Sequence, residues 1–160
     1  MKWRYLRDLE VSAIGMGCMG FTHAYGNSGT PKEGRYLVHR AFDLGCSFFD
    51  TAEMYSYLKN EEFLGQALEG LPRNKVVISD KFWPVSLPGQ EEITDKLSET
   101  GIRKCLAASM KRLKTDYIDL YTLHMMDENH LEQVAASLKP CIHIAQIPSN
   151  RYLHKTSEVS

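Results

Sequence analysis

Short apolar runs alternate along this chain with segments of helical period. The runs have the β-branched and aromatic composition of strands, and the segments between them repeat apolar residues every three or four positions. Strands that alternate with helices form βαβ units with right-handed crossovers, which indicates the α/β class with a parallel sheet. We predict strands over 10–17, 46–50, 76–82, 117–123 and 141–147, and helices over 33–44, 61–69, 102–113 and 131–138.

The number of these units does not decide whether the sheet is open or closed. A closed barrel of parallel strands takes eight βα units and about 250 residues. This chain has 160 residues, enough for four or five units and for one domain.

Three local expectations follow from helix chemistry. Gly45 is expected to end the first helix, and Asn60 to cap the second, because their residue types suit those ends. On the third helix, the basic residues are expected to form the solvent face; they are Arg103, Lys104, Lys111 and Arg112.

Composition narrows the function classes. The chain has 19 basic and 20 acidic residues, a balance that does not favour a nucleic acid or an anionic membrane as partner. Its apolar runs are too short to span a membrane and its first residues lack a secretory signal, so we expect a cytoplasmic protein.

The four cysteines are too far apart in sequence for a zinc site or a thiol redox pair, and no metal site is predicted. We expect four free thiols, mostly in the core. The exception is Cys18, which lies in a glycine-rich turn and is expected to be accessible.

Polar residues stand where the predicted strands end. Asp50 ends one strand, Lys81 lies near the end of the next and His124 ends the one after, while Tyr55 follows Asp50 in its loop. Sites of parallel α/β proteins form at the carboxyl ends of strands. A lysine ammonium held by a carboxylate favours the phenolate form of a nearby tyrosine, and a histidine can orient a carbonyl oxygen, so these residue types suit proton transfer.

Each of these residues also has an ordinary structural interpretation. Asp50 alone is typical of a strand-end cap, and Tyr55 of a loop anchor with its ring against the core. Lys81 suits an edge residue whose stem covers apolar surface, and a single His124 suits a hydrogen-bonded core imidazole. Their occurrence together at successive strand ends favours the functional interpretation.

Several segments around these residues resemble the aldo-keto reductase family in sequence and in order, from about Arg4 to about Leu138. The matching segments are GMGCMG at 15–20, FFDTAEMY at 48–55, NEEFLGQAL at 60–68, KVVISDKF at 75–82 and RLKTDYIDLYTLH at 112–124.

The resemblance implies a TIM-type (β/α)8 barrel that transfers hydride from NADPH to an aldehyde or ketone, a small-molecule carbonyl substrate. It places the family's catalytic residues on Asp50, Tyr55, Lys81 and His124. Tyr55 is then the general acid, Lys81 and Asp50 tune it, and His124 positions the carbonyl. The resemblance further places the turn at Gly17, Cys18 and Met19, together with Asp50, beside the cofactor.

The chain departs from the family pattern at three places. Ser56-Tyr57 stands where the family usually has glycine after Tyr55, and Asp80 replaces a small or hydroxyl residue. Strand alternation is expected to point Asp80 away from Lys81, toward the helices. The pattern fades after Leu138, so we divide the chain into a partial barrel of four to five βα units over 1–138 and a divergent C-terminal tail over 139–160.

Two functional hypotheses follow. The first is an NADPH-dependent reductase with Tyr55 as general acid. The second is a catalytically inactive, truncated barrel remnant or interaction module, because an incomplete barrel exposes sheet edges through which it could self-associate.

Overall fold

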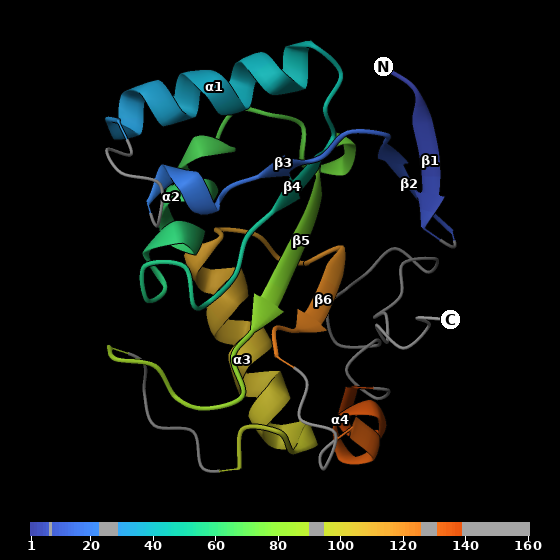
Figure 1. The fold of residues 1–160 in the computed structure, drawn as a ribbon, viewed down its shortest axis with the longest axis vertical. Coiled ribbons are helices and arrows are strands. Elements are labelled where there is room, and N and C mark those ends of the chain that lie inside the picture. Colours follow the sequence, from blue (N-terminus) through green and yellow to red (C-terminus); the bar gives the residue numbers. More distant parts are fainter. Residues whose placement is uncertain (7, 23–28, 90–94, 126–130, 139–160) are drawn as a thin grey trace.

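A four-stranded parallel sheet forms the centre of the computed structural model, which describes residues 1–6, 8–22, 29–89, 95–125 and 131–138. Neighbouring strands follow the order β3-β4-β5-β6, and each pair is parallel. This confirms the predicted α/β class. The elements are β1 (Trp3–Leu6), β2 (Leu9–Ser12), β3 (Met16–Gly17), η1 (Met19–Phe21), α1 (Pro31–Asp43), β4 (Phe48–Asp50), α2 (Lys59–Ala67), η2 (Arg73–Lys75), β5 (Val77–Phe82), α3 (Glu99–Arg112), β6 (Leu120–Leu123) and α4 (Leu131–Leu138) (Figure 1).

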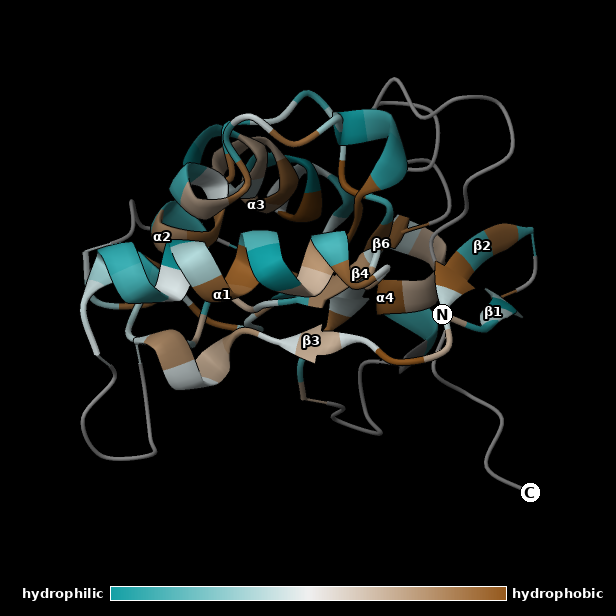
Figure 2. Ribbon diagram, turned by 90° about the horizontal axis from the view of Figure 1, so that it is seen from above, coloured by the Kyte–Doolittle hydropathy of each residue, from teal (hydrophilic) through white to brown (hydrophobic). Residues whose placement is uncertain are grey.

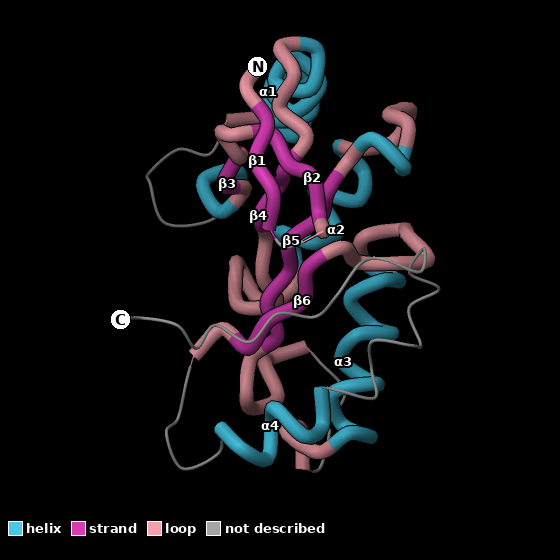
Figure 3. The backbone as a smooth tube through the Cα atoms, turned by 90° about the vertical axis from the view of Figure 1, so that its right-hand side faces the viewer, coloured by secondary structure: helices cyan, strands magenta, loops and turns pink. Residues whose placement is uncertain are grey.

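The helices cover one side of this sheet. Helices α2 and α3 lie along the same side of the strands (Figure 3). The core between the two layers includes Phe49 of β4, Ile78 of β5, Leu64 of α2 and Ile102 of α3, which are almost fully buried. Hydrophobic and hydrophilic bands alternate along α1 (Figure 2), and Val38 on its inner side joins the same cluster. Apolar burial between the sheet and the helices therefore stabilises the packing of the strands.

The single strand predicted over 10–17 is wrong, because the chain forms two strands there. β2 pairs antiparallel with β1, which the sequence analysis did not predict, and β3 then joins the parallel sheet. Between them the Ser12 hydroxyl donates to the Ile14 carbonyl at 2.8 Å. A Cβ on Gly15 would lie 2.5 Å from the Phe48 ring, so only glycine allows this close approach. The bend separates a hairpin from the sheet.

Helix α1 begins two residues earlier than predicted. The Thr30 hydroxyl accepts from the Glu33 amide at 3.2 Å, and the Glu33 carboxylate accepts from the Thr30 amide at 2.7 Å. This capping box, followed by Pro31, fixes the start of the helix. Gly45 follows the last turn with φ of +91°, which confirms its predicted place at the helix end.

The expected cap of α2 is wrong. Leu58 occupies the N-cap with a left-handed backbone, and Asn60 lies inside the first turn. The side chain of Asn60 is instead directed to another segment, where it donates to the Cys18 carbonyl. A tertiary contact therefore replaces the local cap.

The later elements follow the predicted order. β5, α3, β6 and α4 lie within a few residues of the expected bounds. On α3, however, Arg112 is not part of the solvent face, since its side chain is 13% exposed and pairs with the Glu61 carboxylate. The predicted strand over 141–147 and the tail over 139–160 lie outside the described residues.

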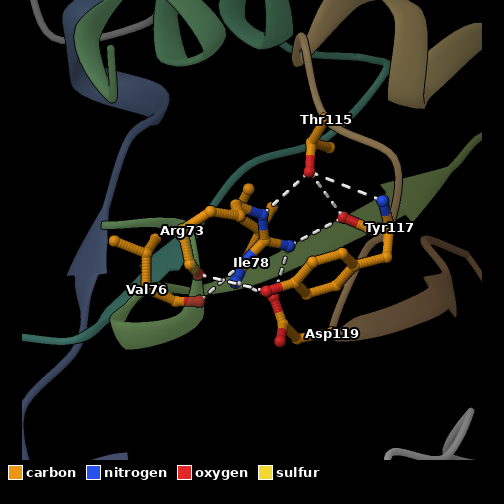
Figure 4. Close-up of polar contacts among 6 residues, drawn as sticks. All are labelled: Arg73, Val76, Ile78, Thr115, Tyr117 and Asp119. Atoms are coloured by element: carbon orange, nitrogen blue, oxygen red, sulfur yellow. Dashed lines mark hydrogen bonds and ion pairs between the residues drawn. The ribbon is translucent and has the colours of Figure 1, made fainter. Parts of the chain in front are cut away.

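The amino ends of β5 and β6 are joined by one guanidinium (Figure 4). Arg73 donates to the Asp119 carboxylate, the Tyr117 carbonyl and the Val76 carbonyl at 2.7 Å each, and to the Thr115 hydroxyl at 2.8 Å. The Arg73 Cζ atom also lies over the Tyr117 ring, 3.7 Å from its centre. This network fixes the strand ends opposite to those that carry the predicted site.

Candidate active site

The parallel register brings the predicted site residues to one end of the sheet. Asp50 is the last residue of β4, Lys81 precedes the last residue of β5 and His124 follows β6. The register pairs Asp50 with Ser79 on β5, and the His124 amide donates to the Phe82 carbonyl at 3.0 Å. The strands β5 and β6 therefore end level, and β4 ends opposite Ser79, two residues before Lys81.

Lys81 and Asp50 form an ion pair at this end. The Lys81 ammonium donates to Asp50 Oδ1 at 2.6 Å and to the Thr51 carbonyl at 2.7 Å. The Ser79 hydroxyl donates to Asp50 Oδ2 at 2.8 Å, which orients the carboxylate. With side chains 17% and 34% exposed, the pair is shielded from water but open on one side.

The two rings of the predicted site lie against this pair. Lys81 Nζ is 5.1 Å from the centre of the Tyr55 ring, within the range of a cation–π contact. The Tyr55 ring meets the His124 ring edge to face, with centroids 5.5 Å apart. The structure thus brings together all four residues that the sequence singled out.

The surroundings of His124 favour the neutral form of its ring. Partial burial lowers the pKa of His124, the Lys81 ammonium lowers it further, and the Asp50 carboxylate opposes both. Its Nδ1 atom is buried and has no hydrogen-bond partner among the described residues. The Trp83 ring also packs edge to face with the His124 ring, with centroids 5.3 Å apart. A neutral imidazole that packs against two rings can donate one hydrogen bond to a carbonyl oxygen.

The turn at Gly17, Cys18 and Met19 lies directly beside Asp50. The Cys18 amide donates to the Asp50 carbonyl at 2.8 Å. The prediction that the Cys18 thiol is accessible is wrong, because the side chain is fully buried and directed toward the Met16 carbonyl. Burial, reinforced by the Asp50 charge, raises the pKa of the Cys18 thiol far above its usual value. The turn therefore offers its main chain, and not a thiolate, to the site.

Behind β5 lies a buried charged cluster that the sequence analysis did not identify. It consists of Glu53, Glu61, Asp80, Lys96 and Arg112, all with little or no exposure. Asp80 is turned toward the helices, as strand alternation predicts, and burial together with the Glu61 and Glu53 charges raises the pKa of Asp80 well above its ordinary value. The sequence analysis did not identify the cluster because the spacing of charged residues in the sequence does not show which of them are buried.

Glu53 connects this cluster to the site. Its Oε2 atom accepts from the Trp83 amide at 2.8 Å and from the Lys96 ammonium at 2.8 Å. Lys96 also donates to the Val85 carbonyl at 3.1 Å. The cluster thereby holds the main chain at the start of the loop after β5, at Trp83 and Val85.

The described residues contain no candidate metal site. Among them, no group of three or more histidine, cysteine, aspartate or glutamate side chains could hold a metal ion. None of the described helices is long and apolar enough to span a membrane.

The fold and site together define a class of protein. A parallel sheet that carries Asp, Tyr, Lys and His at the carboxyl ends of its strands has the form of part of a (β/α)8 enzyme barrel. Residues 13–144 match the model of the aldo/keto reductase family. This chain belongs to the aldo/keto reductase family.

Relatives and solved structures agree with this assignment. A probable aldo-keto reductase of Glycine max is 36% identical over 137 residues, and an aldo-keto reductase of Schizosaccharomyces pombe, named for NADP(+), is 37% identical over 146 residues. These matches cover 85% and 90% of this chain but 39% and 43% of the relatives, so the chain spans less than half of their length.

Two solved structures also match most of this chain with less than half of their own length. The holo form of an aldo-keto reductase from Bacillus halodurans matches with a TM-score of 0.74 and 30% identity, over 89% of this chain and 47% of that one. An aldo-keto reductase from Klebsiella pneumoniae in complex with NADPH matches with a TM-score of 0.64 and 31% identity, over 84% and 42%.

Proposed function

We propose that this chain contributes the proton-transfer site of an NADPH-dependent reductase of aldehydes or ketones, with Tyr55 as general acid. Lys81, Asp50 and His124 complete the site. The observation that carries the proposal is the position of the Lys81 ammonium, which is bonded to the Asp50 carboxylate and faces the Tyr55 ring. Membership of the family and the NADPH complex of the Klebsiella pneumoniae relative support the choice of reaction.

The residues divide the proton-transfer step between them. The neutral His124 ring donates a hydrogen bond to the carbonyl oxygen and orients it toward Tyr55. Tyr55 then gives its hydroxyl proton to that oxygen as negative charge develops there. The phenolate that remains is stabilised by the Lys81 ammonium, which Asp50 keeps in place. NADPH, when bound, supplies the hydride that reduces the carbonyl carbon, so the product is an alcohol.

The turn at Gly17, Cys18 and Met19, with Asp50, is the part of this chain that we propose to lie beside NADPH. A Cβ built on Gly17 would meet no described atom within 4 Å, so the backbone there leaves room for a flat ring. Because the Cys18 thiol is buried, it is the main chain of the turn that would line the cofactor.

Titration of the purified 160-residue chain with NADPH, followed by fluorescence, tests this proposal. Micromolar binding, equivalent to about 8 kcal/mol, together with oxidation of NADPH by a simple aldehyde is the expected result. The mass of the binding species is measured in the same sample. If no binding is detected up to millimolar NADPH, the proposed reaction is wrong for this chain.

The alternative is an interaction module without activity. Among the described strands, β3 and β6 each pair with one neighbour only, so each has an outer edge. Unpaired strand edges recruit other strands, and self-association through them is the behaviour expected of such a module. A monodisperse chain that reduces an aldehyde contradicts this alternative, whereas large assemblies without NADPH binding favour it.

A further inference from the structure

Asn60 is a fully buried amide whose hydrogen bonds all leave its own helix. Its Nδ2 group donates to the Cys18 carbonyl at 2.9 Å and to the Thr22 hydroxyl at 2.7 Å, and its Oδ1 atom accepts from the Thr51 hydroxyl at 2.8 Å. The side chain has no solvent exposure. An amide in such a place is stabilising only while its donors and acceptor are satisfied.

These partners belong to two segments that border the candidate site. Cys18 and Thr22 flank η1 in the turn after β3, while Thr51 follows Asp50 at the end of β4. The same Thr51 contributes the carbonyl that accepts from Lys81. One side chain of α2 therefore joins the turn after β3 to the residue beside the Lys81–Asp50 pair.

The other contacts of this turn include the packing of the Phe21 ring on the Phe63 ring of α2, with centroids 5.0 Å apart. The Cys18 amide donates to the Asp50 carbonyl, and the Ser56 hydroxyl donates to the Thr22 carbonyl. Asn60 is the residue that contacts both ends of the turn, at Cys18 and at Thr22. Loss of its Nδ2 donors would leave the Cys18 carbonyl with the hydrogen bond from the Phe21 amide inside the turn.

We propose that Asn60 is a positioning residue that holds residues 18–22 against the end of β4 and so sets the affinity of the turn for NADPH. The effect on NADPH affinity rests on the proposed function. The effect on the position of the turn is independent of that function and can be measured separately.

Cys18 provides the measurement, because its thiol is fully buried while the turn is held. Burial raises the pKa of this thiol, so a labelling reagent reacts only when the turn opens. Cys105 is also fully buried in the same apolar cluster, but it lies on α3 and not in the turn. Local release of the turn exposes Cys18 alone, whereas general loss of stability exposes both thiols.

The decisive variant is Asn60→Asp, which keeps the size of the side chain and the acceptor for Thr51 but removes both donors. Alkylation rates of individual cysteines are measured by mass spectrometry of peptides. We expect the Cys18 rate to rise at least tenfold and the Cys105 rate to stay within twofold. Ser47→Ala is the matched control, because the Ser47 hydroxyl accepts from the Ser12 amide away from this turn, and it should leave the Cys18 rate unchanged.

Two results would overturn the proposal. One is an unchanged Cys18 rate in the Asn60→Asp variant, and the other is an equal rise at Cys18 and Cys105. If that variant does not fold, Thr22→Val removes one acceptor of Asn60 with little change in shape. It should raise the Cys18 rate alone by about threefold, and an unchanged rate contradicts the proposal.

Titration with NADPH tests the effect of Asn60 on cofactor affinity separately from its effect on the position of the turn. We expect Asn60→Asp to raise the Kd for NADPH at least tenfold and Ser47→Ala to leave it unchanged. An unchanged Kd despite an exposed Cys18 contradicts the effect on affinity. A wild-type chain that binds no NADPH overturns the proposed function, and the labelling of Cys18 then still decides whether Asn60 holds the turn.

Discussion

A partly buried cation lies at each end of β5, and the two cations are bonded in different ways. Arg73 at the amino end donates to four different residues and stacks on the Tyr117 ring (Figure 4). Lys81 at the carboxyl end has three N–H donors, and the described residues accept two of them. Its remaining side faces Tyr55.

This difference separates a structural contact at the amino end of β5 from the candidate active site at its carboxyl end. Four protein acceptors and the Tyr117 ring hold the Arg73 guanidinium at the strand ends, where its role is in stability. The Lys81 ammonium instead faces the ring of the proposed general acid and can respond to a charge that develops there. In barrels of parallel strands, chemistry gathers at the carboxyl ends and stability at the amino ends, and the variants below test that division in this chain.

The largest effect is expected for Tyr55→Phe at the carboxyl end. Removal of the proposed general acid should lower the rate of carbonyl reduction by a hundredfold to ten-thousandfold, the range typical of such groups. Stability should change by less than about 0.5 kcal/mol, as for substitutions that break no structural contact. Steady-state kinetics with NADPH and urea unfolding check the two parts. Tyr36→Phe on the exposed side of α1 removes a hydroxyl in the same way and should alter neither.

Arg73→Met at the amino end should show the opposite pattern. The Asp119 carboxylate has no solvent exposure, and removal of its cation should lower the free energy of unfolding by about 3 kcal/mol. Urea unfolding measures this change. Arg73→Lys keeps the charge but not the planar set of donors, so its loss should be smaller. Wild-type stability in the methionine variant would show that the network contributes little.

Asp80→Asn tests the buried cluster on the helix side of the same strand. Burial, with the Glu61 and Glu53 charges, raises the pKa of Asp80 in the folded chain above its unfolded value of about 3.9. The folded state then retains a proton that the unfolded state has lost, so wild-type stability falls as pH rises from about 4 toward the folded pKa. The variant removes this dependence. It should be more stable than wild type at pH 7, by more than about 0.5 kcal/mol, and the difference should shrink toward pH 4.

Urea unfolding at a series of pH values measures this difference. A constant difference between the two proteins from pH 4 to pH 7 would mean that Asp80 does not retain its proton.

The smallest effect concerns the backbone after Tyr55. Ser56, Tyr57 and Leu58 all have left-handed φ angles, of 49°, 48° and 74°. Such conformations are unfavourable for residues other than glycine by about 1 kcal/mol or more. Tyr57→Gly should therefore raise the free energy of unfolding by about 1 kcal/mol, yet lower turnover several-fold because the loop that carries Tyr55 becomes less rigid.

Lys114→Gly is the matched control, because Lys114 has a φ of 54° in a turn after α3, away from the site. The ion pair of Lys114 with Glu69 is exposed, so its loss should cost little. The stability gain of this variant should be similar, with turnover unchanged. Equal kinetic effects of the two variants would show that the loop conformation has no special role in the site. Unfolding curves and kinetics are measured on the same preparations.

Much of the fold could be predicted because periodicity reports burial locally. The alternation of strand and helix, the end of α1 at Gly45 and the inward side of Asp80 all follow from the spacing of apolar residues or from single-residue preferences. The β1–β2 hairpin could not be predicted in this way. All four residues of β1 are exposed, so the strand has no alternation of buried and exposed positions to detect.

The sequence alone determined which residues form the candidate site, because polar residues at the ends of apolar runs can be recognised without coordinates. Only the tertiary structure decided how they are bonded. Asn60 contacts Cys18 across 42 positions, and Arg112 contacts Glu61 across 51. Local preferences instead favoured a cap for Asn60 and a solvent face for Arg112. Contacts between distant segments form only when the sheet and helices assemble, and the burial of charge and amide groups is decided at that stage.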